Sequence, residues 1–151
     1  MGNKFSCRKA IISDVFAIVN KLRQDDVEEL AISNKTPLVS LLEGYIFSTE
    51  CYACVINNTT VVGLFGISPH LDNTGMNTIW YLGTEDITLV PIQWVRTSKI
   101  ILNQWIKKYG VLTNFIYLKN SLHINWLKKM GAIFSAPIGS FKQFFIIEEI
   151  K

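Results

Sequence analysis

The sequence predicts a single α+β domain over residues 1–151, with helices flanking a mixed sheet. Its length of 151 residues is the usual size of one domain. The hydrophobic fraction of 49% and the charged fraction of 18% are typical of a packed globule rather than of a disordered chain. The apolar periodicity indicates the element order β-α-α-α-β-β-β-α-β-α-β. Because that order combines antiparallel strands with two helical crossovers, it defines the predicted class.

The N-terminal third is expected to hold one strand and three helices. The expected elements are a strand at 5–12 and helices at 15–24, 25–30 and 38–47. Ser13 and Asp14 are expected to provide the N-cap of the first helix, because their side-chain oxygens accept hydrogen bonds from helix amides. Pro37 stands at the first turn of the third helix, where proline is favoured.

The rest of the chain is expected to be β in the middle and to alternate strands and helices afterwards. The expected elements are strands at 52–56, 61–67 and 78–82, a helix that follows Pro91 and ends at Gly110, a strand at 112–118, a helix at 122–130 and a strand at 141–147. Residues 57–60, Asn-Asn-Thr-Thr, predict a hairpin turn. Residues 70–77 are expected to form a polar loop.

The cysteines do not predict a disulfide framework or a zinc site. Cys51 and Cys54 form a C-x-x-C pattern, but they lie in an expected strand, where a spacing of three sends side chains to opposite faces. No second Cys or His pair is present to complete a tetrahedral zinc site. With Cys7, they are interpreted as thiols of a reducing cytosol.

Charge is distributed unevenly along the chain. Residues 1–95 carry a net charge of −4, and residues 96–151 carry +7. A basic half suits a polyanionic partner, either a phosphorylated cofactor or a nucleic acid, and it is equally compatible with solvated helix faces. No apolar stretch is long enough for a membrane span, and the N-terminus lacks the apolar core of a signal peptide. We therefore expect a cytoplasmic protein with no membrane partner.

The most specific stretch runs from Phe115 to Gly131, Phe-Ile-Tyr-Leu-Lys-Asn-Ser-Leu-His-Ile-Asn-Trp-Leu-Lys-Lys-Met-Gly. It resembles the strand–Asn–helix–Gly signature of the GNAT superfamily of N-acetyltransferases, in which Asn120 opens the helix and Gly131 closes it. The resemblance implies a GNAT-like fold, whose mixed central sheet has antiparallel N-terminal strands and a parallel splayed pair. It also implies acetyl-CoA as the possible cofactor.

Within the superfamily, the chain resembles short GNAT-like proteins of podoviruses, among them internal virion proteins. The resemblance lies in Thr84-Glu85-Asp86 at a strand end, a basic helix, and the block from Lys119 to Phe134, which includes His123. It implies a bacteriophage protein in the host cytoplasm, with a virion or host protein as partner.

The chain departs from active members of the superfamily at the loop that binds the cofactor pyrophosphate. Those members have Q/R-x-x-G-x-G/A there, whereas this chain has Gln93-Trp94-Val95-Arg96-Thr97-Ser98. Arg96 obstructs close approach of the backbone to a phosphate, and Trp94 is expected to add bulk. The resemblance places the cofactor contacts at Val90, Gln93, Arg96, Thr97, Ser98 and Asn120.

The chain also lacks a clear general acid and general base for acetyl transfer. Leu127 occupies the position at which many members carry a tyrosine acid, and leucine cannot donate a proton. Tyr109 and Tyr117 are interpreted as packing residues. The resemblance places the general base at Glu85, and His70 and His123 are the alternatives.

Three functional hypotheses follow. The first is a non-catalytic phage protein that acts in virion assembly or in binding a host protein. The second is an N-acyltransferase that moves an acetyl group from acyl-CoA to an amine of a protein or small molecule. The third, nucleic-acid binding by the basic half, ranks last because a single arginine lies beyond residue 95.

Overall fold

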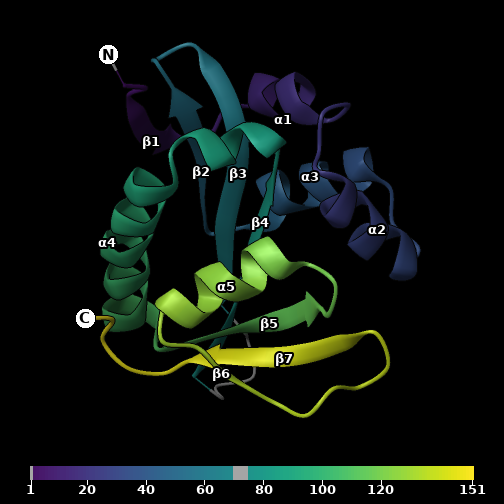
Figure 1. Cartoon of the computed structure of the whole chain (residues 1–151), viewed down its shortest axis with the longest axis vertical. Coiled ribbons are helices and arrows are strands. Elements are labelled where there is room, and N and C mark those ends of the chain that lie inside the picture. The colour runs from purple at the N-terminus through teal and green to yellow at the C-terminus, as the bar shows by residue number, and fades with distance from the viewer. Residues whose placement is uncertain (1, 70–74) are drawn as a thin grey trace. The chain divides into compact units, whose positions relative to one another are not determined.

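The computed structural model describes residues 2–69 and 75–151, and its elements follow the expected order (Figure 1). They are β1 (Phe5–Lys9), α1 (Ile12–Ile18), α2 (Gln24–Ile32), α3 (Pro37–Phe47), β2 (Glu50–Ile56), β3 (Thr60–Pro69), β4 (Met76–Gly83), the 3-10 helix η1 (Glu85–Leu89), α4 (Pro91–Tyr109), β5 (Val111–Tyr117), α5 (Ser121–Lys129), β6 (Ile133–Phe134) and β7 (Phe141–Ile146). Two of these, η1 and β6, were not expected from the sequence.

The strands form a seven-stranded sheet with the order β1-β2-β3-β4-β5-β7-β6. The pairs β1–β2, β2–β3, β5–β7 and β6–β7 are antiparallel, and β4–β5 is parallel. The predicted class, an α+β fold with a mixed sheet flanked by helices, is therefore confirmed. Within the described residues, no helix is both long and apolar enough to cross a membrane.

The chain divides into two compact units. The first unit comprises residues up to Ser68 together with Trp80–Trp94, and the second comprises Pro69–Ile79 together with Val95–Lys151. The expectation of one domain over residues 1–151 stays a prediction.

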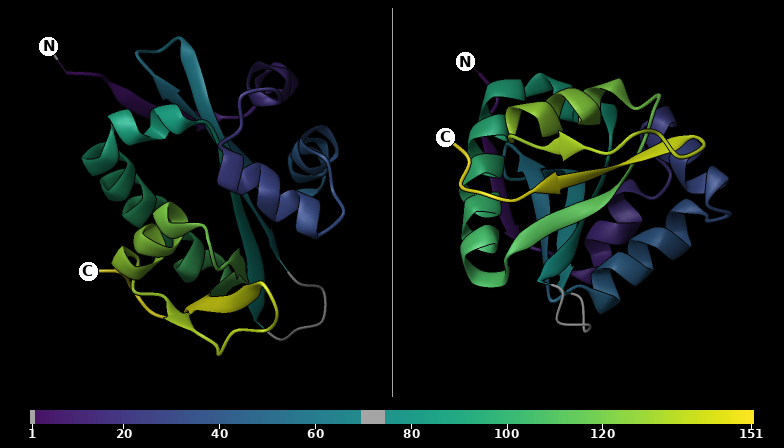
Figure 2. Two further views of the ribbon diagram at one scale, coloured as in Figure 1. Left: turned by 45° about the vertical axis from the view of Figure 1, so that its right-hand side comes forward. Right: turned by 90° about the horizontal axis from the view of Figure 1, so that it is seen from below.

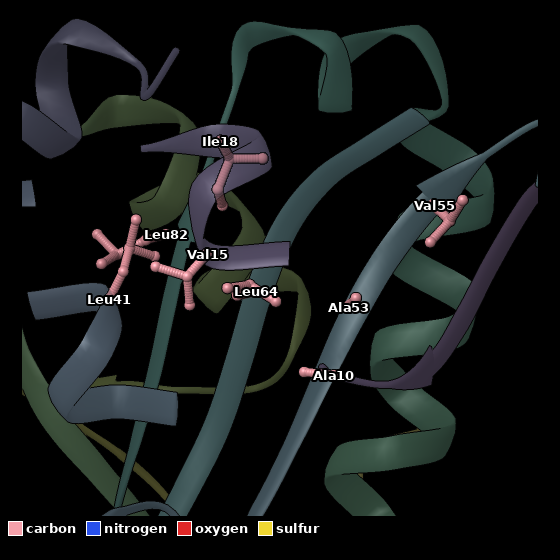
Figure 3. Packing of buried hydrophobic residues seen from close by; sticks show 8 residues of the cluster. All are labelled: Ala10, Val15, Ile18, Leu41, Ala53, Val55, Leu64 and Leu82. Atoms are coloured by element: carbon pink, nitrogen blue, oxygen red, sulfur yellow. The ribbon is translucent and has the colours of Figure 1, made fainter. Parts of the chain in front are cut away.

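The core of the first unit lies between helices and one face of its strands. Val15 and Ile18 of α1 and Leu41 of α3 have no exposed surface, and they pack toward Ala53 of β2 and Leu64 of β3 (Figure 3). The hairpin between β2 and β3 is confirmed, because Asn57 and Asn58 both have the positive φ that such turns require.

Helix α1 begins three residues before the expected start at Val15. The Asp14 carboxylate accepts the Ile11 backbone N–H at 2.8 Å, so Asp14 lies in the first turn and does not precede the helix. The Arg8 guanidinium also donates to both oxygens of that carboxylate, at 2.8 and 2.9 Å. The prediction of Ser13-Asp14 as the N-cap was therefore wrong. In α3, Pro37 is the first helical residue, as expected, and the Thr36 hydroxyl oxygen accepts the Val39 N–H as its cap.

The second unit contains the parallel pair, and that pair separates after three residue pairs. The ladder joins Met76–Thr78 to Val111–Thr113. Beyond it, the Asn114 side-chain amide donates to the Ile79 carbonyl at 2.7 Å, so a side chain takes the place of the next backbone partner. β5, β7 and β6 lie side by side in the same unit (Figure 2). Asn114 thus lies where β4 and β5, the parallel pair that the resemblance implied to be splayed, separate.

Helix α5 begins and ends where its sequence signature predicts. Asn120 precedes the helix and its carbonyl accepts the Ile124 N–H at 3.0 Å. At the other end, Gly131 has φ +77°, and the Ala132 N–H donates back to the Leu127 carbonyl. Glycine is favoured at this position because it adopts positive φ without a steric penalty.

Candidate functional site

At the carboxyl end of β4, in the first unit, a buried ion pair lies beside the strand. The Arg23 guanidinium is 4% exposed and donates to Asp26 at 3.2 Å, and Asp26 has no exposed surface. The other oxygen of Asp26 accepts the Gly83 N–H at 3.2 Å, and the Gly83 carbonyl accepts the Arg23 N–H at 2.9 Å. These bonds fix the start of α2 against the last residue of β4.

Sequence reasoning missed this ion pair. The acids at 25 and 26 suggested only a helix N-terminus, and the bond to Gly83 spans 57 residues. The available signal was Arg23 two residues before the adjacent acids Asp25 and Asp26, since an arginine among carboxylates at a helix start often pairs with them.

Glu85, the predicted general base, is the first residue of η1 and lies close to this ion pair. Its side chain is 70% exposed, and its carboxylate is 3.8 Å from the Arg23 Nε. Thr84 caps η1, with its hydroxyl oxygen accepting the Asp86 N–H at 3.3 Å. A general base must accept a proton from its substrate, and a carboxylate oxygen can do so.

The start of α4 offers few backbone donors. Val90 is fully buried, and its carbonyl accepts the Trp94 N–H at 2.9 Å. Pro91 has no N–H, so at most the amides of Ile92 and Gln93 can turn toward an anion. The exposed Gln93 side chain donates to the Asn3 carbonyl at 3.4 Å.

Trp94 points into the first unit and not toward solvent. Its ring is 5% exposed and lies 5.5 Å from the Tyr81 ring, at an interplanar angle of 41°. The expectation that Trp94 adds bulk at the loop was therefore wrong. Burial raises the pKa of Tyr81 well above its ordinary value, so this phenol is protonated at neutral pH.

Arg96, Thr97 and Ser98 continue α4 in the second unit. Arg96 is exposed and Thr97 is half-buried. Ser98 is 9% exposed, and its hydroxyl oxygen accepts the Trp126 indole N–H at 3.0 Å, which ties α4 to α5. Ser98 is also two turns from the start of the helix.

Asn120 has no exposed surface, and its side chain is turned toward its own helix. The Asn120 amide nitrogen lies 3.1 Å from the Nδ1 of His123, which is itself 6% exposed. Although Asn120 occupies the N-cap position, its side chain makes no cap bond. Leu127, at the position of the missing tyrosine, is 2% exposed and belongs to the core.

The remaining candidates occupy packing positions or are not described. The Tyr117 ring lies 6.0 Å from Phe141, and the Lys108 ammonium lies 5.1 Å from the Tyr109 ring. His70 lies outside the described residues. Among the described residues, no cluster of three His, Cys, Asp or Glu side chains can hold a metal ion.

Solved structures with the same fold include several acetyltransferases. A domain from Methanocaldococcus jannaschii has a TM-score of 0.72 and 16% identity, and covers 97% of this chain and 99% of its own. The ribosomal-protein-S5-alanine acetyltransferase from Vibrio fischeri has a TM-score of 0.64 and 14% identity, with coverage of 97% and 95%. The GNAT domain of PAT from S. lividans has a TM-score of 0.69 and 9% identity, with coverage of 94% and 89%. The chain therefore has the GNAT fold.

A family model narrows the assignment. The model described as "Bacteriophage T7, probable scaffold protein Gp13" matches residues 53–137, which is more than half of the chain. The chain belongs to this phage Gp13 family. A search of curated proteins finds no significant match to the sequence.

Proposed function

We propose that this chain is a non-catalytic phage protein with the GNAT fold, and that it acts in virion assembly by binding other proteins. The proposal rests on the loss of the phosphate-binding glycines in α4. Arg96 and Ser98 stand at the glycine positions, and the Ser98 hydroxyl is hydrogen bonded to Trp126. The scaffold description of the Gp13 family supports a role in the particle.

The residues present fit acyl-CoA poorly. A pyrophosphate needs several backbone amides at close range, and the start of α4 offers at most two, because Pro91 has none and the Trp94 N–H is bonded to Val90. The Asn120 amide is buried against His123. Arg96 is the strongest remaining donor, since it is charged and exposed.

Acid catalysis also lacks its usual group. Protonation of a departing thiolate needs an O–H or N–H donor, and the motif position holds the buried Leu127. Tyr117 is 6% exposed and packs against Phe141, so its position favours a structural role.

Exposed apolar side chains support binding to a protein. At the C-terminal end of α3, Ile46 is 62% exposed and Phe47 is 74% exposed. Val39 lies about two helical turns before Ile46 on the same side of the helix, and it is 47% exposed. Large apolar side chains grouped in this way on a surface often mark protein contacts. We propose this α3 surface, defined by Val39, Ile46 and Phe47, as a contact with a virion or host protein in the host cytoplasm.

The alternative proposal is an acyl-CoA-dependent N-acyltransferase, and the acetyltransferases with the same fold favour it. In that case Glu85 would be the general base. Arg96 and Thr97 would meet the phosphates, with Val90, Gln93, Ser98 and Asn120 as the other cofactor contacts.

Calorimetric titration with acetyl-CoA separates the two proposals, with desulfo-CoA and ATP as controls. We expect no saturable heat at about 1 mM acetyl-CoA, a concentration that detects dissociation constants up to that range. Saturable binding that Arg96→Glu weakens at least tenfold would overturn the non-catalytic proposal and support the acyltransferase.

A further inference from the structure

Two cysteines that are distant in the sequence are paired across neighbouring strands of the first unit. Cys7 of β1 and Cys54 of β2 are Cα partners in the antiparallel ladder, and their sulfur atoms are 3.8 Å apart. Directly opposed residues in such a ladder have Cα atoms about 4.5–5.5 Å apart, which lies within the range that a disulfide spans. The backbone is thus already placed for a bond between these sulfur atoms.

The third cysteine, Cys51, is on the other face of β2. Its side chain packs against the core cluster that includes Ala53 and Val55, whereas Cys54 faces Cys7. The prediction that the C-x-x-C pair points to opposite faces is therefore confirmed. The two cysteines whose sulfur atoms lie close together are Cys7 and Cys54. The C-x-x-C pattern of Cys51 and Cys54 does not indicate this pair.

The two paired thiols differ in access and acidity. Cys7 is half-buried, while Cys54 is 1% exposed. The hydrogen bond with Cys54 lowers the pKa of Cys7, although burial opposes this effect. The same hydrogen bond, together with burial, raises the pKa of Cys54. Cys7 is consequently the more nucleophilic sulfur at neutral pH, and Cys54 is a protonated neighbour.

We propose that Cys7 and Cys54 form a peroxide-sensitive dithiol site, in which Cys7 is oxidised first and Cys54 closes a disulfide between β1 and β2. The oxidant is hydrogen peroxide or an organic hydroperoxide. The bond would attach β1, the first strand in the sheet order, to its neighbour.

The reaction proceeds in two balanced steps. The Cys7 thiolate attacks one peroxide oxygen, the O–O bond breaks, and the leaving hydroxide takes a proton to form water, so that Cys7 becomes a sulfenic acid. The Cys54 sulfur then attacks the Cys7 sulfur, the S–O bond breaks, and the thiol proton leaves with the hydroxyl as a second water. Two thiols are oxidised by two electrons in total, and one hydrogen peroxide is reduced to two waters. With an organic hydroperoxide the first leaving group is the alkoxide, and the products are one alcohol and one water.

Thiol counting and mass spectrometry test the site on the full chain. After exposure to hydrogen peroxide, we expect the three free thiols to fall to one, with a mass loss of about 2 Da from two hydrogens and a peptide that joins Cys7 to Cys54. Dithiothreitol should restore all three thiols. The melting temperature of the oxidised chain should rise, because the bond closes a long loop in the unfolded chain.

Cys51→Ser is the matched control, because Cys51 is a half-buried thiol of the same strand whose pKa burial raises to about 11. Cys51→Ser should retain the 2 Da loss, whereas Cys7→Ser and Cys54→Ser should not show it.

The proposal is overturned if the wild-type chain keeps three thiols under conditions that oxidise glutathione. It is equally overturned if Cys7 proceeds to sulfinic acid without a bridge to Cys54. Cys54→Ala provides a second variant with a smaller side chain in case the serine at this buried position impairs folding.

Discussion

The Trp126 indole N–H donates to the Ser98 hydroxyl oxygen over 3.0 Å, and this bond connects α4 to α5 within the second unit. Ser98 stands at the second glycine position of the superfamily loop, and its hydroxyl takes part in packing α4 against α5. Trp126 is half-buried. Its ring packs between α4 and α5, and its indole N–H needs a hydrogen-bond partner there, which Ser98 supplies.

This contact predicts a measurable coupling between the two side chains. Ser98→Ala and Trp126→Phe should each lower the free energy of unfolding, Ser98→Ala by about 1 kcal/mol, since each removes the hydrogen bond. The double variant should lose less than the sum of the two, because the bond can be lost only once. Urea denaturation measures all four proteins, and strictly additive losses would show that the bond contributes nothing.

The buried ion pair of the first unit predicts a large difference between two adjacent acids. Asp26→Ala leaves the buried Arg23 and the Gly83 N–H without their carboxylate, so we expect a loss of about 3–5 kcal/mol in unfolding free energy. Asp25→Ala is the matched control, because its carboxylate is 38% exposed and lies 3.3 Å from the same guanidinium. Exposed pairs contribute about 0–1 kcal/mol. Equal losses at the two positions, measured by denaturant titration, would contradict this account.

The helices of the fold could be predicted from the sequence more fully than its pairings. The N-cap of α3 and the ends of α5 depend on residues within a few positions of each other, such as Thr36 with Val39, Asn120 with Ile124, and Leu127 with Ala132. In contrast, the bond from Asp26 to Gly83 joins residues whose approach depends on the completed sheet. The start of α1 was misplaced because Asp14 is satisfied by Arg8 as well as by the helix, and the sequence does not show which partner a carboxylate takes.

The candidate site was predictable only as a set of positions. The positions of Trp94 and Ser98 follow from the motif spacing, but the direction of the Trp94 side chain depends on the buried Tyr81, and that of Ser98 on packing against α5. β6 has two residues and η1 has five, and both are too short for a periodic signal.

The Asp14 carboxylate predicts a dependence of stability on pH. Burial of Asp14 raises its pKa, but the hydrogen bonds from Arg8 and the Ile11 N–H outweigh that effect, so the pKa in the folded chain lies below its ordinary value. A lowered pKa means that the stabilisation is complete above the unfolded value of about 4 and is lost as the pH falls through the folded value.

Asp14→Asn should therefore be less stable than the wild type at pH 7, and the difference should shrink as the pH falls below about 4. Asparagine keeps an oxygen for the Ile11 N–H, so the comparison isolates the charge that Arg8 binds. Glu43→Gln serves as the control, because the Glu43 pair with Lys35 is exposed at both ends. A stability difference that is constant from pH 7 to pH 3 would show that the ionised form of Asp14 makes no special contribution.

Restoring the superfamily pattern in α4 tests why acetyl-CoA is expected not to bind. Arg96→Gly combined with Ser98→Ala converts residues 93–98 to the form Q-x-x-G-x-A. If the lost backbone approach is the obstacle, this variant should bind acetyl-CoA measurably, while the wild type shows no heat at about 1 mM. The variant should also be about 2 kcal/mol less stable, because it has a glycine inside the helix and lacks the hydrogen bond to Trp126.

Arg96→Ala with Ser98→Ala is the matched control, because it removes the same side-chain groups without introducing a glycine. If both variants gain equal affinity, the Arg96 side chain itself is the obstacle. If neither gains any, the obstacle lies elsewhere in the chain, and the eroded loop does not account for the missing affinity.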